Sequence, residues 1–278
     1  MLMYIQKKGI LLLLLMVVIS LMFFFSSSQP LKNVNSYKIY YDPPTAAIIE
    51  EMQNYDLILI EPVFYSAEDV KKIKKSGTLV YGYINAMEAD RWNTDLFDRM
   101  EDRDFFEQNG KRIYYEQWDS YLMDMTSDHY RQTLTDEVER QILSKGLDGA
   151  FLDTVGNIDN EFLSEPQTWD EQTDGLVKWL STLKSSFPDL SLIQNWGFTT
   201  LEQKTSSYVD GFMWEGFDYS SIVQDDWSLE NLQRLKEIRK KHDLQVFTVS
   251  TMEERKSAKL ASSHRFVHYH NSSTYNDW

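Results

Sequence analysis

Short apolar runs alternate with amphipathic, helix-like segments along most of the chain. Eight runs are too brief for helices and end at turn residues, as buried strands do. They cover residues 37–41, 57–60, 78–84, 149–153, 190–194, 211–214, 245–249 and 265–269. Helices are predicted between them at residues 45–53, 66–75, 128–145, 169–187, 199–206, 228–241 and 253–262. Eight alternating units are the number that closes a (β/α)₈ barrel, so we predict the α/β class and a TIM-type barrel.

The alternation breaks between residues 89 and 127, after the third predicted strand. Asn109-Gly110 is a strong hairpin signal inside this segment. We interpret residues 121–125 as part of this long aromatic insertion, although they could form a ninth strand. Long ordered loops are usually functional, so we expect the insertion to overhang a binding site. Its aromatic residues are Trp92, Phe105, Phe106, Tyr114, Tyr115, Trp118 and Tyr121.

Two of the predicted strands repeat one pattern. Residues 148–153 read DGAFLD and residues 210–215 read DGFMWE: an Asp-Gly, three apolar residues and an acid. Each reads as a buried strand that is entered through a glycine turn. An acid at the end of such a strand usually emerges into a site, because burying a lone carboxylate is costly. Alternation puts Asp153 and Glu215 on the face that lines the barrel.

These acids end the fourth and sixth strands, and Asn195 ends the fifth. All three are therefore predicted at the catalytic mouth of the barrel. Strand ends two places apart are separated by about 10 Å at the backbone, and inward side chains shorten this distance. That range includes both the roughly 5.5 Å of a retaining glycosidase and the roughly 6.5–9.5 Å of an inverting one. The alternative is that both acids merely cap their strands.

The first 29 residues have the pattern of an export segment. Lys7 and Lys8 precede an uncharged run over residues 9–25, and small polar residues follow. Cleavage as a signal peptide and retention as an N-terminal membrane anchor are both open, and either puts the rest outside the cytoplasm. We predict a linker at residues 30–36 and one catalytic domain at residues 37–278.

The formal net charge of −15 for 278 residues narrows the possible partners. A surface this acidic repels phosphate backbones, which argues against nucleic acid binding. It favours a cationic partner, although acidity could serve solubility alone. The chain has no cysteine, so it forms no disulfides.

The segments YGYINAMEAD, GLDGAFLDTV, LIQNWG and VDGFMWEGF resemble the endo-α-1,4-polygalactosaminidases of glycoside hydrolase family 114 over about residues 37–270. The resemblance implies a (β/α)₈ fold and endo-acting hydrolysis of extracellular α-1,4-linked galactosamine and N-acetylgalactosamine polymers, as in biofilm matrix turnover. It also implies that Asp153 and Glu215 are catalytic, and that Glu88 and Asn195 belong to the site. Such a polymer is cationic when partly deacetylated. Two positions depart from the pattern: Met87 where glycine is frequent, and Gly156 where a second aspartate is.

We assign Asp153 as the nucleophile or charge stabiliser and Glu215 as the acid/base, since apolar neighbours favour a protonated carboxyl. The reverse assignment remains an alternative. Asn195 would bind a sugar hydroxyl or serve as a turn residue. Four aromatic residues, each otherwise a core residue, are candidate sugar-stacking platforms: Trp196, Trp118, Trp92 and Tyr83.

Other chemistry has little support in the sequence. Glu61 and Asp124 are weaker site candidates. His268 and His270 share a strand face but have no evident third metal ligand, so we expect no metal and no cofactor. Two alternatives to the polygalactosaminidase remain: a non-catalytic polysaccharide-binding barrel, and a glycosidase that acts on a different α-linked glycan.

Overall fold

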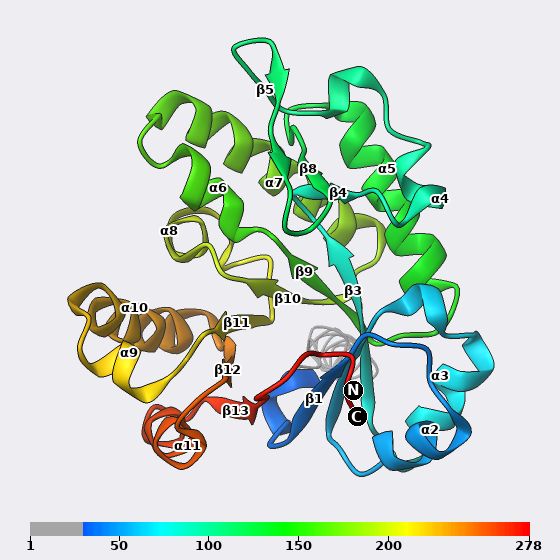
Figure 1. The fold of residues 1–278 in the computed structure, drawn as a ribbon, viewed down its shortest axis with the longest axis vertical. Helices are drawn as coiled ribbons and strands as arrows, with labels where there is room; N and C mark the ends of the chain where they lie inside the picture. Colours follow the sequence, from blue (N-terminus) through cyan, green and yellow to red (C-terminus); the bar gives the residue numbers. More distant parts are fainter. Residues whose placement is uncertain (1–29) are drawn as a thin grey trace, which may run out of the picture. The chain divides into compact units, whose positions relative to one another are not determined.

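The computed structural model describes residues 30–278, and these contain an eight-stranded parallel sheet (Figure 1). Its strands lie side by side in chain order, each with a helical segment after it except the last. The fold is thus the predicted (β/α)₈ type. The strands are β1 (Tyr37–Tyr40), β2 (Leu57–Ile60), β3 (Leu79–Asn85), β9 (Gly149–Asp153), β10 (Ser191–Asn195), β11 (Gly211–Glu215), β12 (Gln245–Ser250) and β13 (Val267–His270).

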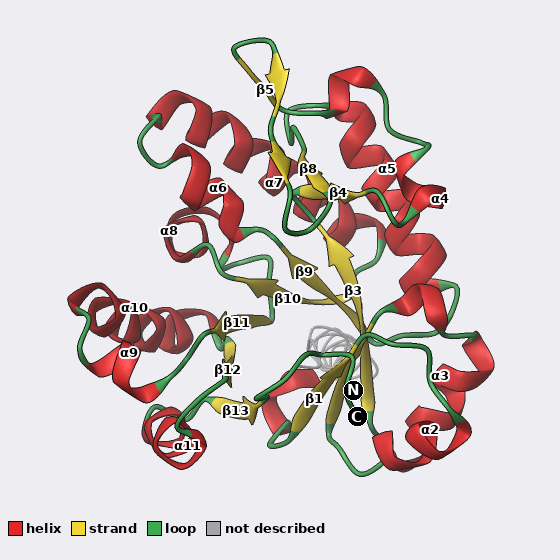
Figure 2. Cartoon of the chain, viewed as in Figure 1, coloured by secondary structure: helices red, strands yellow, loops and turns green. Residues whose placement is uncertain are grey.

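The helices surround the strands (Figure 2). The longer ones were predicted, whereas α6 and α9 were missed because they are short and have no side-chain cap. The predicted helix over residues 128–145 ends as a π-helix, Glu139–Leu143. The α-helices are α2 (Ala46–Met52), α3 (Ala67–Ile73), α4 (Thr94–Phe97), α5 (Asp128–Val138), α6 (Gly156–Phe162), α7 (Pro166–Ser186), α8 (Phe198–Thr200), α9 (Tyr219–Val223), α10 (Asp226–His242) and α11 (Glu254–Ser263). A second π-helix, Leu201–Thr205, follows α8, and short 3-10 helices occupy Pro30–Asn33, Pro62–Phe64, Lys74–Ser76 and Asp102–Asp104.

Inward and outward residues of the strands form two separate hydrophobic cores. Phe151 and Met213 belong to the inner core with Tyr81 and Phe247, whereas Leu152 belongs to the outer core beneath the helices. This confirms the predicted alternation. It follows that Asp153 and Glu215, two residues further along, have the inward parity at the mouth of the barrel.

The glycines of the two Asp-Gly pairs lie inside strands, so the predicted glycine turn is wrong. Neither Gly149 nor Gly211 has a positive φ. A Cβ atom on Gly149 would lie 2.3 Å from the ring of Tyr81 and 2.4 Å from the carbonyl oxygen of Ser191. Glycine is required here because the barrel interior is close-packed, not because the backbone turns.

The aspartates of these pairs join neighbouring strands at the end of the barrel opposite the acids. Asp148 accepts hydrogen bonds from the backbone N–H of Val80 at 2.9 Å and from Lys74 Nζ at 2.8 Å. In the same way, Asp210 accepts from the N–H of Leu192 and from Lys184 Nζ, both at 2.9 Å. The repeat therefore encodes an aspartate that fixes the start of the preceding strand as well as an acid at the mouth.

The segment between β3 and α5 forms two small antiparallel sheets and the short helix α4. Asn109 and Gly110 form the predicted hairpin turn with positive φ angles of 54° and 71°. Strand β8 pairs with β4 and β7 rather than with the barrel, which agrees with assigning residues 121–125 to this segment. The strands are β4 (Glu88–Asp90), β5 (Glu107–Gln108), β6 (Lys111–Arg112), β7 (Tyr114–Tyr115) and β8 (Ser120–Leu122).

The predicted export segment, residues 1–29, lies outside the described residues. In the part of the chain that the structure describes, no helix is both long and apolar enough to cross a membrane. The compact unit that contains the barrel spans Leu31–Trp278.

We expect Asp148→Ala and Asp210→Ala each to lower the free energy of unfolding by about 2–3 kcal/mol, because each leaves a strand N–H and a lysine without their acceptor. Urea denaturation followed by tryptophan fluorescence measures this loss. The control Glu237→Ala removes an acid with a 68% exposed side chain that pairs with Lys240, and it should change stability by less than about 0.5 kcal/mol. Equal losses in all three variants would contradict the strand-fixing role.

Candidate active site

Three polar side chains from successive strand ends meet at the mouth of the barrel. Asn195 Nδ2 donates one hydrogen bond to Asp153 Oδ1 at 2.7 Å and another to Glu215 Oε1 at 2.8 Å. These two carboxylate oxygens therefore lie at most about 5.5 Å apart, the sum of the two bonds. The sequence predicted that all three residues share this mouth, but not that the amide joins the two acids.

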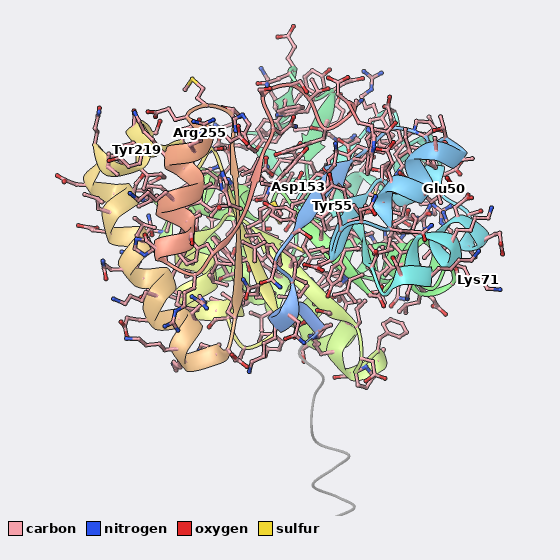
Figure 3. The ribbon with its side chains drawn as sticks, turned by 90° about the horizontal axis from the view of Figure 1, so that it is seen from below. Glu50, Tyr55, Lys71, Asp153, Tyr219 and Arg255 are labelled. Atoms are coloured by element: carbon pink, nitrogen blue, oxygen red, sulfur yellow. The ribbon has the colours of Figure 1, made fainter. Side chains whose placement is uncertain are left out.

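This position is central in the barrel unit. In the view turned by 90° from that of Figure 1, Asp153 lies toward the middle of the unit (Figure 3). Four residues labelled on or beside the outer helices lie toward its periphery: Glu50, Lys71, Tyr219 and Arg255.

Burial and charge favour the protonated form of Glu215. Burial, and then the negative charge of Asp153, raise its pKa to about 7, against the lowering effect of hydrogen bonds from Tyr275 and Asn195. The Tyr275 hydroxyl donates to Glu215 Oε2 at 2.7 Å. Glu215 thus has the proton affinity of a group that can give and take a proton near neutral pH.

Tyrosine side chains surround the two acids. Tyr83 is on β3, and its pKa is well above the usual value because of burial and then the charge of Asp153. Tyr41 packs edge-on against Tyr83, with ring centroids 5.3 Å apart, and against Tyr275 at 5.5 Å. Tyr83 was predicted from the sequence as a site residue, whereas Tyr41 and Tyr275 were not. Tyr41 is the last residue of the first predicted strand, as Asp153 is of the fourth, whereas no periodic pattern marks Tyr275.

Glu88 is buried beside the site, and each of its carboxylate oxygens accepts a hydrogen bond from a protein group. Its Oε1 accepts from Asn157 Nδ2 at 2.7 Å, and Oε2 accepts from the hydroxyl of Ser120. Burial raises its pKa, and the charge of Asp153 adds to this effect. The residue therefore ties the β4–β8 sheet to α6 and lies within electrostatic reach of Asp153.

The position of Trp196 explains why residue 156 is glycine rather than the aspartate that is frequent in the polygalactosaminidase pattern. The tryptophan follows β10 with a positive φ of 55°, and its ring stacks on that of Trp227 with centroids 6.0 Å apart. A Cβ atom on Gly156 would lie 2.6 Å from Trp196 Cβ. An aspartate at residue 156 is incompatible with this placement of the indole.

The remaining aromatic candidates are exposed. Trp92 is 50% exposed and stacks on Phe64, with ring centroids 6.2 Å apart. Trp118 is 62% exposed in the loop between β7 and β8. Neither has a contact that joins it to Asp153 or Glu215 within the described residues, so their role as sugar platforms stays a prediction.

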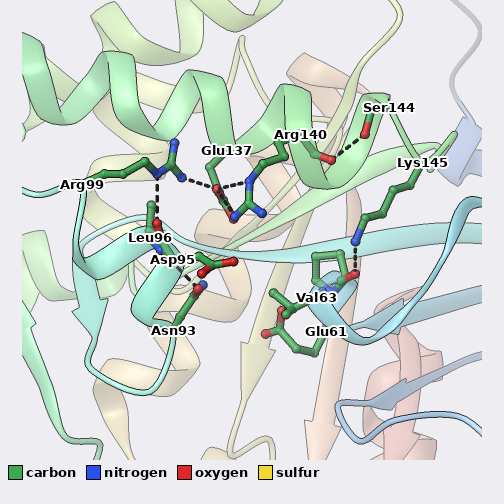
Figure 4. Close-up of polar contacts among 11 residues, drawn as sticks. Glu61, Val63, Asn93, Asp95, Leu96, Arg99, Glu137, Arg140, Ser144 and Lys145 are labelled. Atoms are coloured by element: carbon green, nitrogen blue, oxygen red, sulfur yellow. Dashed lines mark hydrogen bonds and ion pairs between the residues drawn. The ribbon is translucent and has the colours of Figure 1, made fainter.

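A small hollow beside β2 and β3 contains two further acids. Its volume is about 20 Å³, and Glu61, Tyr83, Asp90 and Trp92 contribute to its wall. Burial raises the pKa of Glu61 to about 8 and that of Asp90 to about 6. Lys145 lies nearby but donates to the carbonyl of Pro62, while Arg99 and Arg140 pair with Glu137 (Figure 4).

The other candidates serve structural contacts. Asp124 accepts from the backbone and side chain of Thr126 and from Gln172. His268 and His270 bond the hydroxyl of Ser250, and His268 also bonds Thr248. Between residues 30 and 278, no three His, Cys, Asp or Glu side chains are grouped so that they could hold a metal ion.

We expect Glu215→Gln to gain about 1–3 kcal/mol of stability relative to the wild type between pH 4 and pH 8. The folded protein holds this proton up to about pH 7, whereas the unfolded chain releases it near 4.5, so wild-type stability falls as pH rises through that window. Glutamine has no proton to lose. Urea denaturation at both pH values measures the difference. The control Glu237→Gln, at an exposed position, should show no such change. If the stability difference between Glu215→Gln and the wild type were the same at both pH values, the raised pKa of Glu215 would be refuted.

Comparisons with known proteins identify the kind of protein to which this site belongs. Residues 74–272, more than two thirds of the chain, match the family described as hypothetical glycosyl hydrolase family 15. A comparison with curated proteins finds no match.

Several solved structures have the same fold. The glycoside hydrolase domain of PelA from Pseudomonas aeruginosa is 19% identical, with a TM-score of 0.69 over 88% of this chain and 97% of that one. Ega3 from Aspergillus fumigatus, solved in complex with galactosamine, is 15% identical, with a TM-score of 0.63 over 86% and 91%. The α-galactosidase TtGalA from Thermus thermophilus is 12% identical, with a TM-score of 0.58 over 87% and 58%.

The family match covers the strand ends that carry Asp153, Asn195 and Glu215, and it confirms the expectation of a glycoside hydrolase. The chain belongs to hypothetical glycosyl hydrolase family 15 and is a glycoside hydrolase.

Proposed function

We propose that this enzyme is an exported, endo-acting hydrolase of α-1,4-linked galactosamine and N-acetylgalactosamine polysaccharide, and that Asp153 and Glu215 are its catalytic pair. The observation that supports this assignment is that the Asn195 amide donates a hydrogen bond to both carboxylates. Two acids held this close at the mouth of a barrel are the arrangement that glycoside hydrolysis requires.

The two acids differ in ways that support different roles. Glu215 has a pKa of about 7, raised mainly by burial, so a large share of it is protonated near neutral pH and can protonate the leaving oxygen. Asp153 would be the nucleophile, because its carboxylate faces Glu215 across the bridging amide. In this mechanism Glu215 loses its proton in the first step and, as a base, takes one from water in the second.

The short separation supports retention of the anomeric configuration. A retaining enzyme places its carboxyl groups about 5–5.5 Å apart, whereas an inverting one leaves about 6.5–9.5 Å for a water molecule. The upper limit of about 5.5 Å between the two bonded oxygens agrees with the retaining range. Asp153 therefore attacks the anomeric carbon directly in our proposal.

The substrate class is supported by the motifs, the charge and the neighbours. The sequence resembles polygalactosaminidases, and Ega3 is a structural neighbour that was solved with galactosamine. A net charge of −15 attracts a partly deacetylated, cationic polymer, and the attraction weakens as salt rises. Glu88, Trp196, Tyr83, Trp118 and Trp92 remain proposed substrate-binding residues.

A second candidate is a glycosidase that acts on another α-linked galactoside. The observation in its favour is that α-galactosidases, TtGalA among them, share this fold. Export, with residues 1–29 as a signal peptide or anchor, and a setting such as biofilm matrix turnover are part of the proposal and rest on the sequence.

We expect the wild type to release new reducing ends from partly deacetylated α-1,4-N-acetylgalactosamine polymer. Asp153→Asn and Glu215→Gln each remove a group that acts in the transition state, so release should fall by at least about 10³-fold. A reducing-sugar assay measures the rate. Glu237→Gln is the matched control, and its rate should equal that of the wild type.

Binding of the polymer without release by the wild type would overturn the proposed activity. Release from α-linked galactan alone would favour the second candidate. Unchanged release by either site variant would overturn the assignment of that residue.

We expect the first product to retain the α configuration, because two displacements at the anomeric carbon restore it. Proton NMR during the first minutes of hydrolysis, before mutarotation, measures the anomer. A β-configured first product would show that a water molecule enters between the two acids and that the mechanism is inverting.

A further inference from the structure

The segment after β13, residues 271–278, lies across the open edge of the sheet. Strands β1 and β13 are the two ends of the strand order, and no ladder pairs them in residues 30–278. The backbone N–H of Tyr41, just past β1, donates to the carbonyl of Tyr275 at 2.8 Å. On the other side, the N–H of Asn271 donates to the carbonyl of Ser250 at the end of β12. This segment thus connects the two edges at the mouth.

Trp278 attaches the far end of this segment to the outside of the barrel. Its ring packs edge-on against Tyr40 with centroids 5.4 Å apart and against Tyr55 at 6.1 Å, and Lys38 Nζ lies 4.3 Å from the ring centre. The indole N–H donates to the carboxylate of Glu51. An aromatic anchor with several partners holds residues 274–277 in one path.

Tyr275 contributes the second hydrogen bond to the carboxyl of Glu215. Asn195 donates to Oε1 and the Tyr275 hydroxyl donates to Oε2, so both oxygens are hydrogen-bonded. One donor precedes Glu215 in the sequence and the other follows it. Two donors on different elements determine the plane of the carboxyl group, which one donor alone does not. The family match ends at residue 272, so Tyr275 lies beyond the matched residues.

We propose that residues 271–278 are a positioning element of the active site, in which the Tyr275 hydroxyl orients the carboxyl of Glu215 toward Asp153 and Trp278 keeps Tyr275 in place. Tyr275 is a positioning residue, because it acts through Glu215. The kinetic part of this proposal rests on the proposed function, whereas the orientation of Glu215 does not.

The groups around Glu215 define what removal of the hydroxyl does. Asp153 on β9 raises the pKa of Glu215, while Asn195 and Tyr275 lower it by donating to the ionised form. Tyr37 on β1 and Tyr41 also lie close. Burial and then the charge of Glu215 raise the pKa of Tyr37, and burial followed by the charges of Asp153 and Glu215 raises that of Tyr41. Without the Tyr275 hydroxyl, the ionised form loses a donor, so the pKa of Glu215 must rise.

The first experiment titrates Glu215 directly in the full-length protein. Carbon-13 NMR of glutamate-labelled protein resolves the carboxyl signals, and the signal that Glu215→Gln removes is that of Glu215. In Tyr275→Phe we expect the pKa to rise by about one unit, the effect of one hydrogen bond to a charged group. Tyr208→Phe, at a tyrosine that packs on the outer core, should leave it unchanged. An unchanged pKa in Tyr275→Phe would overturn the proposal.

The second experiment measures hydrolysis of the same polymer. Tyr275→Phe should lower kcat about tenfold, leave KM within about twofold and move the alkaline limb of the pH profile upward. Trp278→Ala should act in the same direction, and adding it to Tyr275→Phe should cost little more, because both changes release one group. The proposal would be overturned if Tyr275→Phe changed KM alone. It would also be overturned if the decreases in kcat caused by Tyr275→Phe and Trp278→Ala multiplied in the double variant. If the wild type does not cleave the polymer, the proposed function fails, and the titration still decides the role of Tyr275.

Discussion

The proposed active site depends on one amide that joins two acids. Two carboxylates at most about 5.5 Å apart in a buried setting repel each other, and the Asn195 amide offsets this by giving one N–H to each. Burial and the charge of Asp153 leave Glu215 with a pKa of about 7. In the proposed mechanism, this pKa lets Glu215 exchange a proton while Asp153 acts as the nucleophile.

The barrel holds these three residues from both ends of the strands. Asp148 and Asp210 fix the starts of the neighbouring strands through a backbone N–H and a lysine each, while Asp153 and Glu215 stand at the ends. Asp148 directly precedes β9 and Asp210 directly precedes β11, so each bond to the start of the neighbouring strand helps to set the register of the strand that ends in an acid.

The sequence predicted the elements whose signals are local. Apolar runs and caps are properties of neighbouring residues, so the eight strands and longer helices were predicted to within a few residues, as was the Asn109-Gly110 turn. The sequence suggested a turn as the reason for Gly149, but the reason is close packing against the ring of Tyr81, 68 positions away. It also missed Tyr275, whose partner Glu215 is 60 positions away. Contacts of this kind leave no periodic pattern in the chain.

The sequence by itself determined the class of fold, the inward parity of Asp153 and Glu215, and the family, because these follow from strand alternation and from short motifs. Only the tertiary structure decided how close the two acids are, that the pKa of Glu215 is raised, and that Asn195 joins the two acids. The physical reason is that separation, burial and hydrogen bonding depend on side chains from different strands meeting in space. Strand order limits these distances to a range, and only packing selects a value within it.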